Sequence, residues 1–484
     1  MDARFEVPIP EGYVIYCGIF TVKGPINVFF KDKTLWSTLI SQMGFAQNVL
    51  KNGLPEKIEL SEEGAYGRKD MLTLFYEGVV NGIYPSTELC ESAPYKYMSH
   101  YRIVIDCDIP LLDCTETIKL RVRNLEFYIL SKDCIIYTIE TDVSGKNLKE
   151  LSLLNRVIRN VEYYQYGYKG YAIHQSFLNL FLPVIQIHNK YDKTNLPMSF
   201  TPTSLKQFAY DLFRGNKLQS YIAIGLPEQE GLFTEDYSMD NLLYEIGTCS
   251  EMGLMLSPND NYYPDLRYYK ELISNNTFSC FSNWKAISLL DSFAIVFKNG
   301  TSINKAWRHC YFQYLYINAL CIRSFLVIIN EKYKRKDMTE SVENDFLDFD
   351  KIFNFQKVAY TFLPDLIYKK MRYGLQIDEE LQIMEDKICK FSEKQYRKSE
   401  RNTNNVLFLL AILALFSAFT DAFQLFKDIE VFKLFHINPD NSDLLLIKHV
   451  YFISLIILIV ICVLYKVNTH SIYDRIKSFF LGNK

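Results

Sequence analysis

Two long apolar runs near the C-terminus, 406–426 and 447–465, dominate the hydropathy pattern of this chain. An α-helix needs roughly 20 residues to cross about 30 Å of hydrocarbon, so each run is long enough to span a bilayer. The second run is uncharged apart from Lys448 at its start, whereas the first carries Asp421 near its end. The pattern predicts a transmembrane hairpin made of these two helices.

Basic residues gather on the outer flanks of this hairpin. They are Lys394, Arg397, Lys398 and Arg401 before the first run, and Lys466, Arg475 and Lys477 after the second. Because basic flanks of membrane helices are retained in the cytoplasm, the pattern predicts cytoplasmic N- and C-termini in a multi-pass protein of the cell inner membrane. Residues 427–446 would then form the external loop and 466–484 a cytoplasmic tail.

The segment before the first run has a heptad pattern. Its apolar positions alternate by four and three residues: Ile377, Leu381, Met384, Ile388 and Phe391. Such a seam makes helices associate, so it predicts a stalk helix over 375–405 and a homo-oligomer. If 375–426 is one helix, its 52 residues extend for roughly 78 Å and connect a cytoplasmic region to the bilayer.

Continued into the membrane, the seam first turns polar and then apolar. This pattern fits a water-filled mouth above a hydrophobic constriction, and the pore-lining residues predicted from it are Asn402, Asn405, Leu409, Ile412, Phe416 and Thr420. A second stripe competes as the pore face: Thr403, Leu407, Leu410, Ala414, Ser417 and Asp421. Small residues on that stripe also suit close packing between spans. Asp421 belongs to the pore prediction in either case, because a carboxylate inside a membrane is a functional candidate that would attract cations.

The pattern before the stalk predicts an α+β domain. Short β-branched and aromatic runs make 1–190 strand-rich, and the run 125–141 has two such parts around Ser131–Asp133, which is typical of a hairpin. A helix is expected over 147–161, with its leucines on one face. Helical patterning dominates 205–374, and the polar, proline-containing segment 188–204 is the predicted subdomain boundary.

Two features of this domain leave alternatives open. Arg156 and Arg159 on the predicted helix could hold an anion, although a solvated helix face is the more ordinary interpretation. The tyrosine-rich tract 161–175 could line a ligand cleft, stacking on a base, or could pack in a core or a subunit contact.

Composition narrows the function. With 484 residues and a net charge of −3, the chain gives no sign of a nucleic-acid-binding surface. Its 11 cysteines include no CxxC pair, which suits reduced thiols in a cytosolic domain. Phosphate-binding glycine loops, GxSxG and HExxH are missing from the sequence. The sequence therefore predicts no enzyme, assigns no catalytic or metal-ligating residue, and predicts no cofactor.

The whole arrangement resembles the CorA family of divalent-cation channels. The likeness lies in the strand-rich N-terminal domain, the helical cytoplasmic region, the long helix entering the first of two C-terminal spans and the basic tail, and it is strongest over 377–484. The resemblance implies a homopentamer whose first spans line the pore. It implies that role here for Asn402, Asn405, Leu409 and Thr420.

This chain departs from the family in one important motif. The Gly-Met-Asn of CorA channels is missing, and Thr420-Asp421-Ala422 stands in its place. The loop 427–446 is also longer than the family's, so selection of hydrated magnesium does not carry over. Divergent CorA-like proteins without the motif include membrane effectors of type III CRISPR systems, which respond to a nucleotide messenger made from S-adenosylmethionine and ATP, and this chain is similar to them in architecture.

The function expected from these features is that of a CorA-like oligomeric membrane effector in antiviral defence. A nucleotide messenger on the cytoplasmic domain would gate it, and opening would disturb ion balance or membrane integrity; the ligand-binding residues are not identified by the sequence. A divalent-cation transporter, with Asp421 and Thr420 in place of the usual selectivity residues, is the first alternative. A membrane-anchored receptor or enzyme, with the hairpin as an anchor only, is the second.

Overall fold

The structure, a computed structural model, describes most of the chain up to the first predicted span. The described residues are 3–20, 29–30, 32–43, 56–57, 99–113, 118–131, 134–161, 170–192, 218–227, 232–298, 306–334, 340–359, 361–428, 449–450, 453, 456–457 and 460. The chain divides into two units, Met1–Glu385 and Asp386–Lys484.

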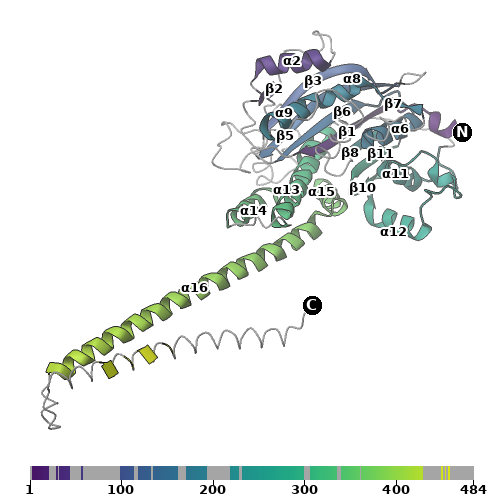
Figure 1. The fold of residues 1–484 in the computed structure, drawn as a ribbon. Helices are drawn as coiled ribbons and strands as arrows, with labels where there is room; N and C mark the ends of the chain where they lie inside the picture. The colour runs from purple at the N-terminus through teal and green to yellow at the C-terminus, as the bar shows by residue number, and fades with distance from the viewer. Residues whose placement is uncertain are drawn as a thin grey trace. The chain divides into compact units, whose positions relative to one another are not determined.

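A mixed nine-stranded sheet forms the centre of the first unit (Figure 1). Its strand order is β2-β3-β5-β6-β1-β8-β11-β10-β9, and β8 and β11 pair in parallel whereas the other described pairs are antiparallel. The strands are β1 Glu11–Phe20, β2 Glu56–Lys57, β3 Ser99–Pro110, β5 Lys119–Ser131, β6 Cys134–Asp142, β8 Gln219–Gly225, β9 Thr277–Phe278, β10 Trp284–Ser288 and β11 Ser292–Phe297. A separate pair joins β4 Leu112–Asp113 to β7 Ala172–Ile173.

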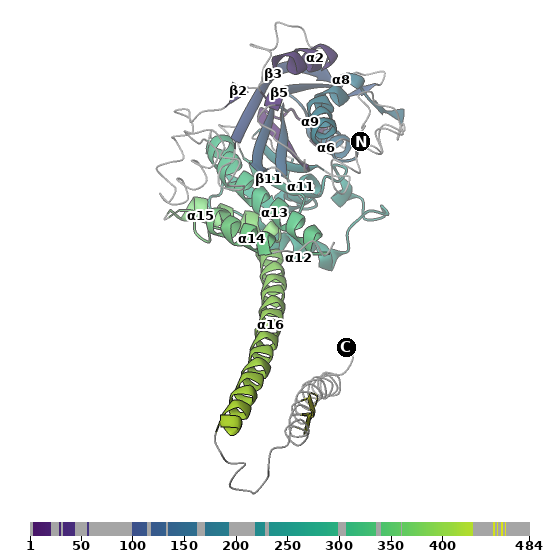
Figure 2. The same cartoon turned by 60° about the vertical axis from the view of Figure 1, so that its left-hand side comes forward.

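Helices lie on both sides of this sheet (Figure 2). The α-helices are α2 Lys33–Met43, α6 Leu148–Arg159, α8 Gln175–Leu178, α9 Leu182–Asp192, α11 Met239–Thr248, α12 Leu266–Asn276, α13 Ile317–Lys334, α14 Glu340–Phe353, α15 Phe362–Gly374 and α16 Ile377–Asp428. Short 3₁₀ turns are η1 Ala3–Glu6, η5 Asn179–Phe181 and η6 Leu254–Leu256, and η7 Trp307–Tyr316 is a π-helical segment that leads into α13. The fold class α+β, with a long C-terminal helix, is therefore confirmed.

The local predictions for the first domain hold in detail. The expected hairpin is β5–β6, whose last pair is Ser131 opposite Cys134. The expected helix is α6, which begins with a capping box: Asn147 accepts from the Glu150 backbone N–H, and the Glu150 carboxylate accepts from the Asn147 N–H. These reciprocal bonds satisfy two otherwise unpaired donors at the helix start, so the start is encoded locally.

Arg159, at the end of α6, was expected to lie on a solvated helix face, but it does not. Its side chain is buried, donates to the Thr248 carbonyl oxygen at 3.0 Å and pairs with Asp291. Arg156 pairs with Glu251 at 2.9 Å. Both charges are thus neutralised within the chain, and the pair fits neither a free helix face nor an anion site.

The predicted boundary at 188–204 does not separate two cores. β1, from the first predicted subdomain, pairs with β6 on one side and with β8, from the second, on the other. One sheet therefore joins 1–190 with 205–374, and both belong to the first unit. Residues 193–217, and most of the tyrosine-rich tract (162–169), lie outside the described residues.

Both faces of the central strands are covered. On one face, Val14, Tyr16, Phe127 and Tyr137 belong to a large apolar core shared with α2, α6, α8, α9 and α11. On the other face, Tyr221 stacks on Phe293 and contacts Phe312 of η7, and its hydroxyl donates to the Trp307 carbonyl oxygen at 3.0 Å. Burial on both faces explains why β1 is nearly continuous in its apolar residues rather than alternating.

Candidate functional site

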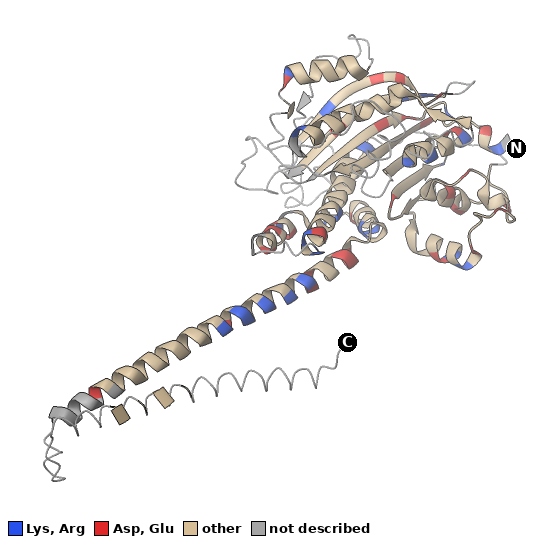
Figure 3. Ribbon diagram, in the orientation of Figure 1, with Lys and Arg blue, Asp and Glu red and all other residues tan. Residues whose placement is uncertain are grey.

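Helix α16 runs unbroken over 52 residues, Ile377–Asp428, and changes character along its length. Figure 3 shows charged residues along its first half and uncharged residues along the second half as far as Asp421. Seven large apolar side chains between Val406 and Phe416 are at least 40 % exposed. At about 1.5–3 kcal/mol for a fully buried side chain, these half-exposed side chains leave roughly 5–10 kcal/mol of burial absent from the single chain, comparable with the stability of a small domain. This segment requires an apolar environment.

A second helix is also long and apolar enough to cross a membrane. Its apolar window within Trp307–Lys334 is 89 % buried, whereas that of Ile377–Ala418 is 0 % buried. The helix formed by η7 and α13 is therefore a core helix of the sheet domain. Only α16 presents an apolar surface on all sides, so it is the candidate membrane segment among the described residues.

All the predicted pore residues lie on α16. Those that the structure exposes are Asn402, Asn405, Leu409, Phe416, Thr420 and Asp421, and Ile412 is half-buried. The Thr420 hydroxyl donates to the Ser417 carbonyl oxygen at 2.7 Å, which is usual for threonine in a helix. In one chain these residues extend along a single helix and enclose no space of their own, so their assignment to a pore stays a prediction.

The first positions of the heptad seam are buried within the single chain. Ile377, Leu381 and Met384 are 0 %, 6 % and 2 % exposed in the single chain. These positions are already filled by intramolecular packing and are not open for a second copy. Ile388, the next seam position, is also only 6 % exposed, so any association through α16 depends on residues beyond Ile388.

The second predicted span falls largely outside the described residues. Its described positions are helical, and their large apolar side chains are about half exposed: Val450, Ile453, Ile456, Ile457 and Val460. The predicted external loop and the tail, apart from 427–428, lie outside the described residues, and so does the rest of the span.

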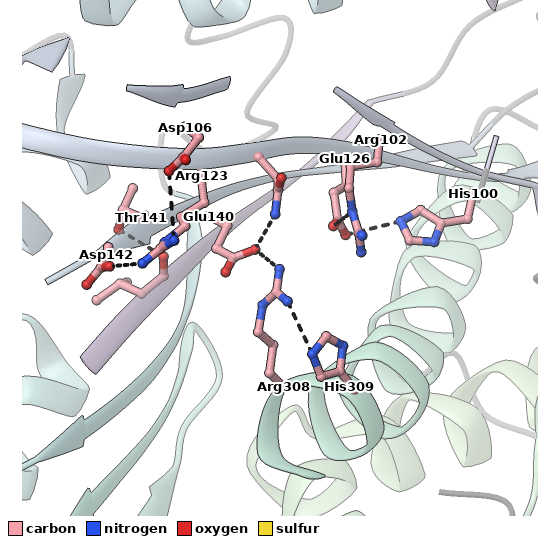
Figure 4. Close-up of polar contacts among 12 residues, drawn as sticks. His100, Arg102, Asp106, Arg123, Glu126, Glu140, Thr141, Asp142, Arg308 and His309 are labelled. Atoms are coloured by element: carbon pink, nitrogen blue, oxygen red, sulfur yellow. Dashed lines mark hydrogen bonds and ion pairs between the residues drawn. The ribbon is translucent and has the colours of Figure 1, made fainter. Parts of the chain in front are cut away.

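A second site lies in the sheet domain, where polar side chains interrupt the face beneath η7. The register places Arg102 of β3 opposite Glu126 of β5, and Glu126 opposite Thr138 of β6. In the next row, Asn124 lies opposite Glu140. Because side chains two residues apart in a strand share a face, the three strands present one continuous polar patch (Figure 4).

Glu126 is held as a buried carboxylate. It is 5 % exposed and accepts from Arg102 Nε at 2.7 Å and from the Tyr128 hydroxyl at 2.7 Å, and it lies 3.1 Å from His100 Nε2. Burial alone would raise the pKa of Glu126, but the Arg102 guanidinium and the other partners outweigh it and hold that pKa well below the usual value. Burial lowers the pKa of His100, an effect that Glu126 opposes only in part. At neutral pH the ring is therefore neutral and donates to a charged carboxylate.

Glu140 connects the sheet to η7. Its Oε2 accepts from Asn124 Nδ2 at 2.9 Å and pairs with Arg308 of η7, while Arg308 Nη1 lies 3.4 Å from His309 Nε2. Glu140 is 6 % exposed, and the Arg308 side chain 24 %. The ion pair thus fixes a π-helical segment onto the sheet, and π-helical turns are found frequently at functional sites.

These side chains line a pocket between the sheet and η7. The lining includes Arg102, Glu126, Thr138, Glu140, Arg308 and Gln313, with Ile15, Tyr128, His309 and Phe312. Two buried polar atoms there have no hydrogen-bond partner in the described part of the chain, the Thr138 hydroxyl and Arg308 Nε. Burial raises the pKa of the Cys17 thiol, which lies opposite Thr138 in the sheet, so this cysteine is not an ionised nucleophile.

Sequence reasoning missed this pocket, although a signal was present. Polar residues recur two apart in three neighbouring strands: His100 and Arg102, Asn124 and Glu126, Thr138 and Glu140. That alternation normally marks the solvent-facing side of an antiparallel sheet. Only the packing of η7 on this side turns an ordinary polar face into a buried one.

Comparisons of this chain with known protein families, with curated proteins and with solved structures find no match.

Proposed function

We propose that this protein is a membrane-inserted, oligomeric channel of the CorA-like type, whose opening is controlled from the sheet domain. The single observation that carries this proposal is α16, one helix that begins buried in the sheet domain at Ile377 and continues into an apolar segment with no buried residue among those described. A simple anchor needs no continuous helix between the folded domain and the bilayer. A channel that responds to its cytoplasmic domain needs a stiff connection of this kind.

The predicted pore has a hydrophobic constriction formed by copies of Leu409 and Phe416. A ring of such side chains closes a pore by excluding water. The controlling ligand is proposed to be a nucleotide messenger and the setting antiviral defence, as the CorA-like resemblance implies. The ligand can shift the channel only by its difference in affinity for the closed and open states.

Ion flux through liposomes that contain the purified full chain tests the proposal. We expect Leu409→Ser and Phe416→Ser to raise the basal leak, because a hydroxyl wets the constriction. Leu410→Ser is the matched control: its side chain is 55 % exposed against 59 % for Leu409, but it belongs to the competing stripe. A leak from Leu410→Ser alone would move the pore to that stripe.

Two further outcomes would replace the proposal. The hairpin would be an anchor if two results were obtained together. Ion flux would stay at background in every variant, with and without nucleotides. The chain would also keep its cellular function after 406–465 are exchanged for an unrelated two-span hairpin. If the chain restored growth of a magnesium-requiring strain, and an Asp421 substitution abolished that growth, a divalent-cation transporter would be favoured instead.

A further inference from the structure

One face of α16 carries positive charge that the helix itself does not balance. Figure 3 shows lysines and arginines gathered in the part of α16 that precedes its uncharged half. Lys394, Lys398 and Arg401 are exposed, and the residues three and four positions away from each of them include no acid. Residues at these spacings are the neighbours on a helix surface. These three residues therefore form a basic face of α16 without an acidic partner along the helix.

The basic face lies on the same side of α16 as the predicted constriction. Because the helix is unbroken, the number of residues between two positions gives the angle between them around the helix axis. At 3.6 residues per turn, Lys398, Lys394 and Arg401 lie about 20°, 60° and 80° from Leu409, in the same direction as Phe416. Copies of α16 that turn Leu409 and Phe416 toward a pore therefore turn the basic face toward its cytoplasmic mouth.

The acidic residues of this segment lie on other sides of the helix. Glu393 pairs with Arg397 at 2.7 Å, which balances that arginine within the helix. Glu393 and Glu400 lie about 160° and 180° from Leu409, and Asp421 lies about 120° away in the direction opposite to the basic face. A pore lined by Leu409 would therefore meet the basic residues first, with the carboxylates turned away from it.

Neighbouring copies of the helix offer no acid to the basic face. In the heptad pattern, Lys394 and Arg401 flank the seam, at positions that form interhelical salt bridges in parallel coiled coils. The residues of a neighbouring copy that would face them are Ser399 and Val406. Lys398 occupies a seam position itself. Association of copies therefore brings these charges together without neutralising them.

Lipid headgroups also leave most of the basic face unpaired. Val406 begins the predicted span, and Lys398 and Lys394 precede it by about 12 Å and 18 Å along the helix axis, at 1.5 Å per residue. The headgroup layer adds only about 5–7 Å on each side of the hydrocarbon. In a helix that crosses the bilayer upright, only Arg401 is close to the headgroups, so anionic lipid does not account for the two lysines.

We infer that the channel conducts small inorganic anions such as chloride, with copies of Lys394, Lys398 and Arg401 around its cytoplasmic mouth. Rings of Lys and Arg favour anions in pores, as rings of Asp and Glu favour cations. Mobile anions would supply the compensating charge that the helix, its neighbours and the lipid do not. This inference rests on the channel function proposed above, and its permeant ion is opposite in sign to that of the divalent-cation channels that the sequence resembles.

The competing pore stripe makes the opposite prediction. Asp421 and Glu400 lie about 20° and 80° from Leu410 around the helix axis. A pore lined by Leu410 would therefore expose carboxylates and favour cations. The sign of the permeant ion thus reports which face of α16 lines the pore.

The reversal potential of the current through a planar bilayer tests the inference. The full chain carrying Leu409→Ser is reconstituted in phosphatidylcholine, whose headgroups have no net charge, and a KCl gradient is applied. Leu409→Ser is expected to provide a basal current without the controlling ligand. We expect this current to reverse near the equilibrium potential of chloride.

Charge variants in the same background locate the selectivity. Lys398→Gln should shift the reversal potential toward that of potassium, and Lys398→Glu should shift it further, because each step makes the pore mouth less positive. Glu400→Gln is the matched control. Glu400 is also exposed and lies two residues from Lys398, but on the side turned away from Leu409, so its substitution should leave the reversal potential unchanged.

Three results would overturn the inference. A current that reverses near the potassium potential would exclude an anion pore, and a shift of that potential by Glu400→Gln would place the Leu410 face toward the ions. Chloride selectivity that Lys398→Glu leaves unchanged would remove the basic face from the ion path. The absence of any current would contradict the channel function itself, and the inference with it.

Discussion

Glu140 forms the ion pair between the sheet and Arg308 of η7. Its carboxylate, which is 6 % exposed, neutralises Arg308 and accepts from Asn124 Nδ2 at 2.9 Å. A buried ion pair contributes little net stability compared with apolar residues, but removal of one partner leaves a buried, uncompensated charge. The polar patch is thus costly to disturb even though it is not what drives folding.

Glu140→Ala should therefore destabilise the sheet domain by about 3–5 kcal/mol. Denaturant unfolding followed by tryptophan fluorescence measures this change, since all three tryptophans, Trp36, Trp284 and Trp307, lie buried in the first unit. Glu6→Ala, which removes an exposed partner of Lys149, should leave the unfolding free energy close to that of the parent. Equal effects of the two substitutions would contradict the assigned role of Glu140.

His100 makes the stability of this domain depend on pH. Its folded pKa lies below the ordinary value of 6.5, so between the two values the unfolded chain binds more protons than the folded one. Stability should therefore fall as the pH drops below about 6.5, by at most about 1.4 kcal/mol per pH unit for this one group. Glu126, whose folded pKa is held below 4.5, should add a further loss at more acidic pH.

His100→Gln checks this dependence, because glutamine can still donate to Glu126 but does not titrate. Unfolding free energies of parent and variant, measured from pH 7.5 to 5, should diverge in slope, with the variant flatter between pH 6.5 and 5. Parallel curves would show that His100 is not the titrating group.

At the scale of elements, α16 is the part of the fold that the sequence predicted best. The predicted span of one helix, 375–426, agrees closely with the observed Ile377–Asp428. A helix depends on periodicity and propensity within a few residues, and 377–426 contains no proline or glycine that would interrupt it. The packing of α16 was less predictable, because a heptad pattern does not show whether the apolar seam packs on another copy of the chain or on other parts of the same chain.

The proposed mechanical role of α16 predicts sensitivity to a break in its polar half. Ser399→Pro removes one backbone hydrogen bond and clashes with the preceding turn, at a cost of about 3 kcal/mol in a helix interior. We expect ligand-dependent flux to be lost while ligand binding to the sheet domain is kept. Ser399→Ala, the control, should leave both unchanged, and retained gating in Ser399→Pro would show that helix continuity is not needed.

The sequence predicted individual strands and one hairpin of the sheet, but not how the distant strands pair. The β5–β6 hairpin follows from two β-rich runs with a tight turn, which is local information. The parallel pairing of β8 with β11, and the place of β1 between β6 and β8, join residues far apart in the chain. No periodicity within a strand specifies such neighbours, which is why a subdomain boundary was expected where one sheet continues.

At the scale of the whole molecule, the predicted topology can be tested directly. A membrane-impermeant maleimide applied to intact spheroplasts should label a cysteine introduced as Asn441→Cys in the predicted external loop. It should leave Cys389, which is exposed on α16 before the first span, unlabelled until the membrane is permeabilised. Labelling of Cys389 from outside would reverse the orientation, and labelling of neither site in intact cells would contradict an external loop.

The apolar runs of membrane length, the β5–β6 hairpin, the start of α6 and the extent of α16 can all be read from the sequence, because each depends on residues that are close together in the chain. The burial of the polar patch cannot be read from the sequence. Arg102, Glu126, Thr138 and Glu140 follow the alternation of a solvent-facing strand, and only the packing of η7 brings Arg308 over them and encloses a pocket. Burial is a property of what covers a surface, and the covering element lies well over 150 residues further along the chain.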